Sequence, residues 1–301
     1  MLIILASTMS LVAQNLAERL GYEKDAKLLI VHADDLGSAH SVNAASIDGL
    51  ENGSISSASV MIPCAWTKEI AEYAINKKER HDLGIHLTVT CEWKNYKWGP
   101  VASKSEVSSL VNEQGFLHAD CVEFGANVDE NEVEKELRAQ IDQAIAMGIQ
   151  PTHLDSHMGC LFWTKPEIFK IYVELAREYK IPCLIEKNFS ALYPEAFKEI
   201  VTDEDVVVDA VFSPGPEDYA KGMDRFYTQV LNNLEPGLNM IIIHAGFDNA
   251  ELQAITIDHP DWGSAWRQAD YDFFRGQSCR DLIESNGIKL ITWREIGDAS
   301  P

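Results

Sequence analysis

The segment KLLIVHADDLG spans residues 27–37 and joins an apolar run to a pair of carboxylates. Its first part, residues 27–32, is short, apolar and rich in branched side chains, which predicts a buried strand. Its second part is Ala-Asp-Asp-Leu-Gly, so acidic side chains follow directly where the strand is expected to end. The same order of apolar strand and polar end recurs along the chain, and it decides both the fold and the chemistry that we expect.

Outward from this segment, short apolar strands alternate with amphipathic helices. Further strands are expected at 56–62, 82–88, 152–157, 182–185, 206–212, 238–244 and 289–292, and helices at 40–52, 67–77, 129–147, 166–179, 219–231 and 266–286. Strict alternation of strand and helix implies a parallel sheet. Seven or eight such units in about 275 residues predict an α/β fold, a TIM-like parallel (β/α) barrel, distorted or incomplete, in one domain over residues 27–296.

The composition of the chain excludes one class of partner. Its 301 residues carry a formal net charge of -22, and the lysines and arginines are scattered without a basic run. Because nucleic acids are bound through clustered basic residues, we expect no nucleic-acid partner. The six cysteines form no CxxC pair and show no zinc-finger spacing, so one or two disulfides are expected only if the protein is exported.

The first residues resemble an export signal. Residues 1–13 are apolar and are followed by Gln14 and Asn15, as in the apolar region and cleavage zone of a secretory signal. We therefore expect a signal peptide at 1–14 and a periplasmic or secreted protein. The segment has no Lys or Arg near its start, which leaves a peripheral N-terminal helix in a cytoplasmic protein as the alternative. It is too short to span a bilayer stably, and no other stretch of the chain could do so.

Polar clusters at strand ends indicate where the chemistry is. Asp34, His86, His157 and His244 all fall at the C-terminal end of a predicted strand. In (β/α) barrels the reacting groups lie at these ends. The carboxylates and imidazoles together are the ligand set of a hydrolytic divalent-metal site.

Asp34 and Asp35 present a geometric difficulty. Neighbouring residues of a strand point to opposite faces, so a regular strand cannot direct both carboxylates to one metal ion. A turn just beyond the strand, which Gly37 would permit, can bring both to one site as one ligand and one base. The alternative for either residue is to cap the following helix.

The cluster at 152–157 has three ionisable residues at alternate positions. His153, Asp155 and His157 would share one face of a strand. Burying all three is costly without a metal ion or a hydrogen-bond network, and the alternative is a solvent-exposed edge. His86 and His244 are single strand histidines, for which a hydrogen-bonded core position is the alternative. If His244 is catalytic, it could protonate a leaving amine, with Asp248 to orient it.

This set of residues favours hydrolysis. A carboxylate and two imidazoles around a metal ion leave positions for water and substrate, and a bound divalent ion lowers the pKa of water from about 15.7 to near 7. A neighbouring carboxylate can then take the proton, which would hydrolyse an amide or an ester. One alternative is a non-haem iron oxygenase, which uses the same ligands but needs no base like Asp34.

At these residues the chain resembles the YdjC/ChbG (ChbG/HpnK) family of carbohydrate deacetylases. The motifs are Ala-Asp-Asp-Leu-Gly at 33–37, Gly-x-His-x-x-x-Thr at 84–90 and Thr-His-Leu-Asp-Ser-His at 152–157, and the resemblance covers about residues 27–295. Two departures are visible. The third motif continues with Met158 and Gly159 in place of further histidines, and a late His-Pro-Gly element is His244-Ala245-Gly246 here.

The resemblance implies a barrel-like α/β fold and an enzyme that removes an acetyl group from an N-acetylated sugar or oligosaccharide. It implies Asp34 as the catalytic base, Asp35, His86 and His157 as ligands of one divalent ion, Mg²⁺ or Zn²⁺, His153 and Asp155 as residues that orient these ligands, and His244 as the acid. Another metal-dependent amidase or esterase is one alternative, and a non-catalytic carbohydrate-binding protein on the same fold is another. The sequence is compatible with a homo-oligomer.

Two aromatic segments are expected near the substrate. Residues 91–128 interrupt the alternation with Trp93, Trp98 and other aromatic residues, and residues 258–274 include Trp262. Segments of this length without periodicity are usually functional. They are expected to form either walls that stack on sugar rings or a packed lid.

Overall fold

A computed structural model describes residues 15–77 and 82–299 of the chain. The predicted signal segment at 1–14 lies outside these ranges. Within them, every helix is too short or too polar to cross a bilayer.

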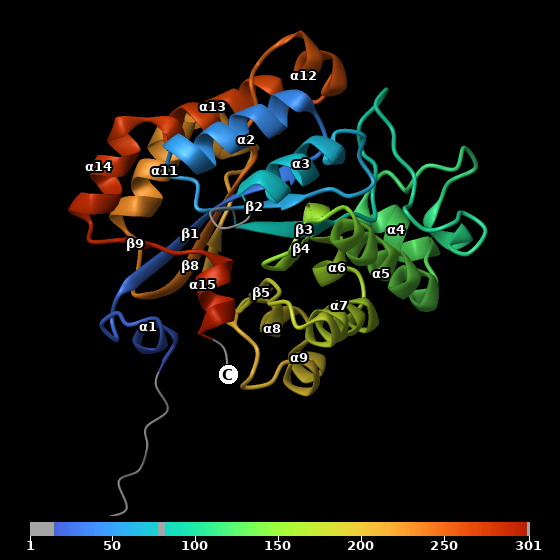
Figure 1. Cartoon of the computed structure of the whole chain (residues 1–301), viewed down its shortest axis with the longest axis horizontal. Helices are drawn as coiled ribbons and strands as arrows, with labels where there is room; N and C mark the ends of the chain where they lie inside the picture. The colour runs from blue at the N-terminus through green and yellow to red at the C-terminus, as the bar shows by residue number, and fades with distance from the viewer. Residues whose placement is uncertain (1–14, 78–81, 300–301) are drawn as a thin grey trace, which may run out of the picture.

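Parallel strands form the centre of the molecule (Figure 1). The main sheet has the order β4-β3-β2-β1-β8-β7, and β9 pairs with the start of β1. Its strands are β1 (Lys27–Leu36), β2 (Ser57–Val60), β3 (Leu83–Leu87), β4 (Leu154–Ser156), β7 (Ala210–Phe212), β8 (Gly237–Ile243) and β9 (Lys289–Leu290). Each strand pair is parallel, as the alternation of strands and helices predicts.

Short strands complete the ring between β4 and β7. A bridge between Leu154 and Cys183 joins β4 to the segment before β5 (Ile185–Glu186), and β5 pairs with β6 (Val207–Val208). Only Asp209 separates β6 from β7, and its backbone N–H donates to Leu238 of β8. The strands therefore curl into a distorted (β/α) barrel, which confirms the predicted fold class.

Helices surround the strands. The longer ones are α2 (His40–Asn52), α3 (Thr67–Lys77), α5 (Glu130–Ala146), α7 (Pro166–Tyr179), α11 (Met223–Asn232), α13 (Ser264–Arg275) and α14 (Gln277–Ser285). The shorter ones are α1 (Leu16–Arg19), η1 (Ser108–Leu110), α4 (Cys121–Asn127), η2 (His157–Gly159), α6 (Cys160–Trp163), α8 (Phe189–Leu192), α9 (Pro194–Ile200), α10 (Pro216–Lys221), α12 (Ala250–Ile255) and α15 (Trp293–Asp298). In Figure 1, α2 lies beside α13 on one side of the sheet, and α5 lies beside α7 on another.

Two helices that were predicted as single pieces are each divided at a glycine. Gly222, with φ of 103°, separates α10 from α11, and Gly276 separates α13 from α14. The first division follows from a backbone conformation that an α-helix cannot contain. The predictions of continuous helices at 219–231 and 266–286 were therefore wrong at these two points.

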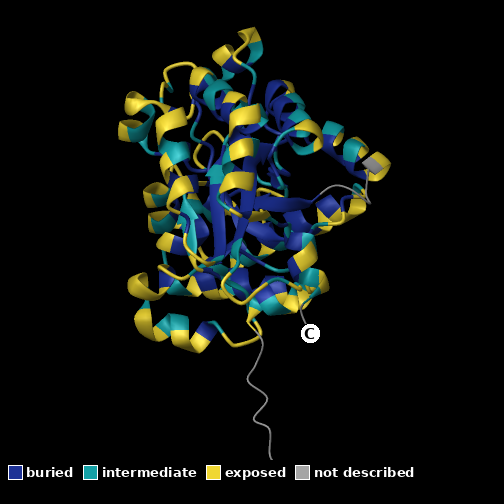
Figure 2. Ribbon diagram, turned by 90° about the vertical axis from the view of Figure 1, so that its left-hand side faces the viewer, coloured by how far each residue is buried: buried dark blue, intermediate teal, exposed yellow. Residues whose placement is uncertain are grey.

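The apolar run at the start of β1 is buried on both faces. Leu29, Ile30 and Val31 have no exposed surface, and all of β1 from Leu28 to Leu36 is buried. Figure 2 shows the strands buried inside and the exposed residues on the outer helices and loops. Burial of this kind, at about 25 cal/mol per Å² of apolar surface, is the main force that holds the sheet against the helices.

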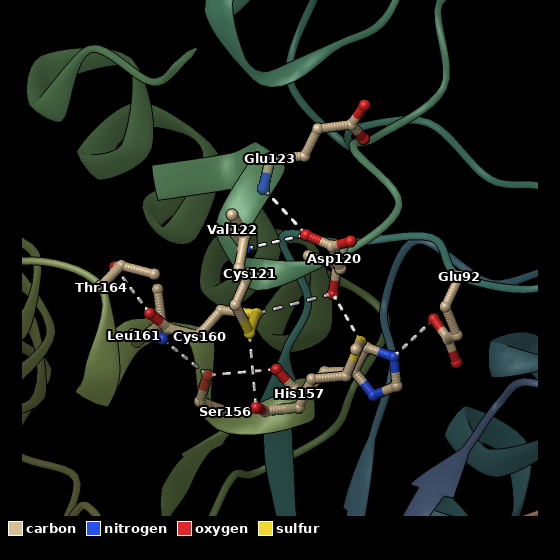
Figure 3. The surroundings of a disulfide bond; sticks show 12 residues. Glu92, Asp120, Cys121, Val122, Glu123, Ser156, His157, Cys160, Leu161 and Thr164 are labelled. Atoms are coloured by element: carbon tan, nitrogen blue, oxygen red, sulfur yellow. Dashed lines mark hydrogen bonds and ion pairs between the residues drawn. A yellow bond between two sulfur atoms is a disulfide. The ribbon is translucent and has the colours of Figure 1, made fainter. Parts of the chain in front are cut away.

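The aromatic segment 91–128 is packed and covalently fixed. Its tryptophans Trp93 and Trp98 and the Phe124 ring are buried, as a packed lid requires. A disulfide joins Cys121 at the start of α4 to Cys160 at the start of α6 (Figure 3). The lid is therefore attached to the chain directly after the third motif.

Candidate metal centre and substrate pocket

A bulge in β1 brings Asp34 and Asp35 to the same pocket. The pairing of β1 with β2 shifts register between Ala33 and Leu36, and Asp35 has a left-handed φ of 69°. Such a bulge redirects side chains that would otherwise alternate between faces. The expected turn beyond the strand was wrong, because the strand continues to Leu36 and the bulge lies inside it. Asp34 and Asp35 both line the pocket, so the two carboxylates reach one site as expected from the sequence.

Asp35, His86 and His157 converge on one point. Each offers one ligand atom, and these atoms lie within 4.8 Å of one another. Asp35 Oδ1 is 3.4 Å from His86 Nε2 and 3.1 Å from His157 Nδ1, and all three residues are buried. Asp35 Oδ1 nevertheless has no hydrogen-bond partner of good geometry in the described part of the chain. A buried oxygen that faces two imidazole nitrogens without bonding to them fits a shared cation.

Each of the two histidines is held by a carboxylate on its far side. His86 Nδ1 is 2.7 Å from Asp155 Oδ1. His157 Nε2 is 3.0 Å from Glu92 Oε2, and Figure 3 shows this contact. Because a carboxylate accepts, these nitrogens carry hydrogens, and the opposite nitrogens can offer lone pairs to a cation that lies between them and Asp35. Histidines that bind metals usually have such a partner.

The electrostatics of the site favour a positive charge. Burial would lower the pKa of His157, but Glu92 and Asp35 outweigh it and raise the pKa to about 9. Burial would also lower the pKa of His86, and Asp34 and Asp155 raise it well above its ordinary value. Without a metal ion these imidazoles hold protons, so a divalent cation would replace proton charge with its own.

Arg267 of α13 fixes the other oxygen of Asp35. Its Nη2 donates to Asp35 Oδ2 at 2.7 Å, and its Nε donates to the carbonyl of Trp262 at 2.7 Å. Burial would raise the pKa of Asp35, but Arg267 and the two histidines hold it well below its usual range. Asp35 therefore stays ionised with Oδ1 directed at the histidines.

Asp34 lies beside this trio without joining it. Its Oδ2 is 3.8 Å from His86 Nε2 and 3.9 Å from His244 Nε2. Its Oδ1 is 3.1 Å from Nε2 of His32, which also lies 2.8 Å from Asp155 Oδ2. Burial would lower the pKa of His32, but Asp155 and Asp34 raise it to about 9, so a buried imidazolium ties the two carboxylates together.

His153 lies deeper than its motif neighbours. Its Nε2 is 3.7 Å from Asp155 Oδ2, and its ring stacks on Trp293 at 5.3 Å between centroids. It does not line the pocket, and burial lowers its pKa. Gly84 of β3 leaves the room for this ring, because a Cβ there would be 2.4 Å from it.

His244 faces the pocket, but Asp248 does not accompany it. His244 Nδ1 has no hydrogen-bond partner among the described residues, and burial lowers the pKa of the imidazole to about 4. Asp248 is exposed and accepts a hydrogen bond from Gln253, because the chain carries it away from β8 toward the start of α12. The structure therefore does not bring Asp248 to His244. Asp270 contacts His244 instead, through the His244 backbone N–H at 2.9 Å.

The pocket around these groups has a volume of about 870 Å³ and aromatic walls. Trp163 and Trp262, with 47% and 38% of their surface exposed, both line it. Four of the five described non-glycine residues with positive φ also line it, namely Asp35, Met158, Asp258 and Trp262. Backbone conformations of this kind cost energy and cluster at binding sites.

Sequence patterns alone gave no functional role to three residues of the site. Glu92 follows the second motif closely, and its place at the start of the long segment was the only signal for it. His32 was taken as part of a strand, although its spacing of two from Asp34 puts both on one face. Arg267 is 232 positions from Asp35, and no local pattern connects them.

Comparisons with known proteins agree over nearly the whole chain. The sequence family described as YdjC-like protein matches residues 28–285. A carbohydrate deacetylase of Thermus thermophilus is 31% identical over 293 residues, which are 95% of this chain and 99% of that protein. A carbohydrate deacetylase of Brevibacillus brevis is 34% identical over 272 residues, 89% of this chain and 99% of that protein.

One solved structure supports the fold. It is a protein of Enterococcus faecalis that is named for cellobiose-phosphate cleavage. It matches with a TM-score of 0.74 at 23% identity and covers 90% of this chain and 99% of that one.

Proposed function

Because this chain belongs to the YdjC-like protein family, we propose that it is a carbohydrate deacetylase that removes an acetyl group from an N-acetylated sugar or oligosaccharide. The relatives of nearly full length are named as carbohydrate deacetylases. The observation that carries the mechanism is the convergence of Asp35, His86 and His157, with a buried oxygen of Asp35 left unbonded.

These three residues would hold one divalent metal ion. Two imidazoles and one carboxylate suit zinc and similar transition ions better than magnesium, which prefers oxygen ligands. Of the two ions expected from the sequence, Zn²⁺ is therefore the better match. When bound, the ion would polarise the acetyl carbonyl and lower the pKa of a water molecule.

The protein's own residues would move the protons. Asp34 lies next to the trio, lines the pocket and is the base that takes a proton from water. His244 is neutral at pH 7, since its pKa is about 4, so it cannot begin the cycle as a proton donor. At Nε2, which faces Asp34, it accepts the proton that Asp34 has taken from water, and it passes this proton to the amine nitrogen as the bond between that nitrogen and the acetyl carbon breaks. The products are acetate and an amino sugar.

The contacts of Asp34 favour this function over the alternatives. An oxygenase with the same ligands needs no base, and a sugar-binding protein needs neither the base nor the facing imidazole. An amidase or esterase for other acyl groups would use the same residues. Only a comparison of substrates can distinguish such an enzyme from a carbohydrate deacetylase.

The test is acetate release from N-acetylated sugars and chito-oligosaccharides, with metal-stripped protein and with single divalent ions added back. We expect release that depends on the ion, and a loss of about 10²- to 10⁴-fold for Asp34→Asn with metal binding retained. The matched control is Asp248→Asn, which removes an exposed carboxylate outside the pocket and should leave the rate unchanged. Metal bound at one equivalent without acetate release would move the search to other acyl substrates. Absence of metal binding would contradict the assignment of the three ligands.

We also propose that the protein is exported. The apolar segment at 1–14 supports this, and so does the Cys121–Cys160 disulfide, because disulfides persist mainly in oxidising compartments. Amino-terminal sequencing of the mature protein from a periplasmic or culture fraction tests it, and an uncleaved cytoplasmic chain would contradict it.

A further inference from the structure

The pocket is lined by many more acidic than basic side chains. Seven carboxylates line it: Asp34, Asp35, Glu92, Asp155, Glu186, Asp258 and Asp261. Among the lysines and arginines of the described ranges, Arg267 alone lines it, and its guanidinium is bonded to Asp35. A negatively charged ligand would therefore find no unpaired lysine or arginine in these walls.

Most of these carboxylates already have a positive or hydrogen-bonding partner. Besides Asp35, Glu92 contacts His157, Asp155 contacts His86, and Asp258 at the rim is paired with Lys94. Asp34 is assigned to the proton transfer. The carboxylates that remain for a substrate are those of Glu186 and Asp261.

Glu186 is held in place with one oxygen unused. Asn188 Nδ2 donates to its Oε1 at 2.8 Å, and burial raises the pKa of the carboxyl. A raised pKa is typical of a carboxylate that is partly buried and has no cation beside it. An ammonium group near Glu186 would supply the missing charge.

Asp261 stands at the other aromatic wall. It directly precedes Trp262, and its carboxylate has no hydrogen-bond or ion-pair partner among residues 15–77 and 82–299. His259 also lines the pocket and is the group closest to Asp261 in sequence that could carry a positive charge. It lies between Asp258 and Asp261 in the chain.

We propose that this pocket selects sugars without phosphate or carboxylate groups and prefers those that carry a free ammonium group, with Glu186 and Asp261 as the specificity-determining residues. The preferred substrates are thus partly deacetylated amino-sugar oligomers. The proposal rests on the proposed function and adds the charge of the substrate. Its physical cause is that like charges repel and opposite charges attract strongly in a partly dehydrated pocket. Because deacetylation creates an ammonium group, a product that keeps a second acetamide would remain a good substrate.

The experiment compares three disaccharides on the metal-loaded enzyme. They are N,N′-diacetylchitobiose, the same disaccharide with one free amine, and its 6-phosphate. We expect kcat/KM for the phosphate to be at least about tenfold below that for the neutral sugar, and kcat/KM for the amine to exceed that for the neutral sugar by about threefold or more. An amine that is used no better than the neutral sugar would overturn the preference for ammonium. Because salt screens such effects, the differences in kcat/KM among the three sugars should shrink between about 50 mM and about 500 mM NaCl, since the Debye length of the solution is about 10 Å at 0.1 M and becomes shorter as salt is added.

Variants locate the effect. In the double variant Glu186→Gln with Asp261→Asn, the phosphate should come within about threefold of the neutral sugar, because the two free charges are gone. Glu199→Gln removes one exposed carboxylate from α9, outside the pocket, and should leave the order unchanged. This control separates pocket charge from the overall charge of the protein.

A second measurement does not depend on turnover. Binding of the amine disaccharide and of the 6-phosphate to the metal-stripped protein can be followed by tryptophan fluorescence, since Trp163 and Trp262 line the pocket. The amine should bind more tightly, and the double variant should lose the difference.

The outcomes separate the two proposals. If the neutral sugar is deacetylated and the phosphate is used equally well or better, the charge selection is overturned while the deacetylase function stands. If the preference exists but survives in the double variant, Glu186 and Asp261 are not its cause. If none of the three sugars releases acetate and the amine binds no better than the phosphate, both proposals fail.

Discussion

Glu92 illustrates how one carboxylate can determine which nitrogen of a histidine is available. It lies 3.0 Å from His157 Nε2 and is half-buried in the pocket wall, where His157 keeps its pKa below the usual range although burial alone would raise it. The hydrogen on Nε2 leaves Nδ1 for a metal ion. The role of His157 therefore depends on a residue outside the motif that contains it.

We expect Glu92→Gln to weaken metal binding by about tenfold or more, because a neutral amide holds the imidazole less firmly and makes it a poorer ligand. Titration of the metal-stripped variant by calorimetry measures this. Glu106→Gln changes an exposed carboxylate of the same segment and is the matched control. Equal affinities in the two variants would show that Glu92 does not support the site.

His244 gives a prediction for the dependence of stability on pH. Its folded pKa of about 4 is below the ordinary 6.5, so between these values the unfolded chain binds a proton that the folded chain does not. Because the folded protein keeps this imidazole uncharged, the free energy of unfolding decreases as the pH falls from about 6.5 to about 4. For one such group the loss between pH 7 and pH 4.5 is about 2 kcal/mol.

Urea unfolding of the metal-stripped protein at the two pH values tests this. In His244→Gln the acid-side loss of unfolding free energy should be smaller than in the unchanged protein by that amount, since glutamine does not titrate. An identical loss in both proteins would mean that His244 is not buried in its neutral form.

At the scale of elements, β3 and β4 must approach closely to align the motifs. Gly84 makes this approach possible, because the His153 ring occupies the space that a Cβ would need. The ring cannot move easily, since Thr152 Oγ1 lies 3.0 Å from its Nδ1 and Trp293 stacks on its face. Gly84 of the second motif thus provides the space that the His153 ring of the third motif occupies.

We expect Gly84→Ala to lower the free energy of unfolding by about 1–3 kcal/mol, the usual cost of forcing extra volume into a packed interior. Thermal unfolding measures it. Gly297→Ala is the control, because a Cβ there would meet Pro182 at an ordinary 3.6 Å. If both variants melt at the temperature of the unchanged protein, His153 can move aside and the packing argument is wrong.

The disulfide acts between elements that are 39 residues apart. By closing this loop it restricts the unfolded chain, which is worth up to about 4 kcal/mol in the chain-entropy account. It also holds the packed lid against the turn that contains Met158, next to His157. Its loss should therefore affect both stability and the site.

Accordingly, Cys121→Ser with Cys160→Ser should unfold at lower urea concentration than the unchanged protein, and a reductant should move the unchanged protein toward the variant. The variant itself should not respond to the reductant, which is the control. A reductant effect of equal size on the variant would assign it to another cause.

At the scale of the whole molecule, the sequence predicts the strands better than the way the barrel closes. Buried parallel strands such as β1 and β8 are continuous apolar runs, so their positions are visible in the sequence. Strands β5, β6 and β7 have two or three residues each, too few for a periodic signal. Their pairing depends on the ring of neighbours that surrounds them.

The same limit applies to the site. Asp34, Asp35, His86 and His157 were identified because strand ends of a parallel barrel gather at one rim. The hydrogen bond between Arg267 and Asp35 could not be predicted from the sequence, because it depends on how α13 packs against the sheet. Asp248 was expected beside His244 from closeness in sequence alone, and the path of the chain after β8 separates them.

The position of β1 in the sheet has a consequence for synthesis of the chain. Lys27 to Ala33 pair with Gly237 to Ile243, so the first strand receives its neighbour on that side only after about three quarters of the chain has been made. Until then an apolar strand has an open edge, the kind of surface to which other chains add. An amino-terminal fragment that stops before residue 237 should therefore aggregate. During translation, β1 at the start of the domain would therefore be the segment that most needs protection by a chaperone.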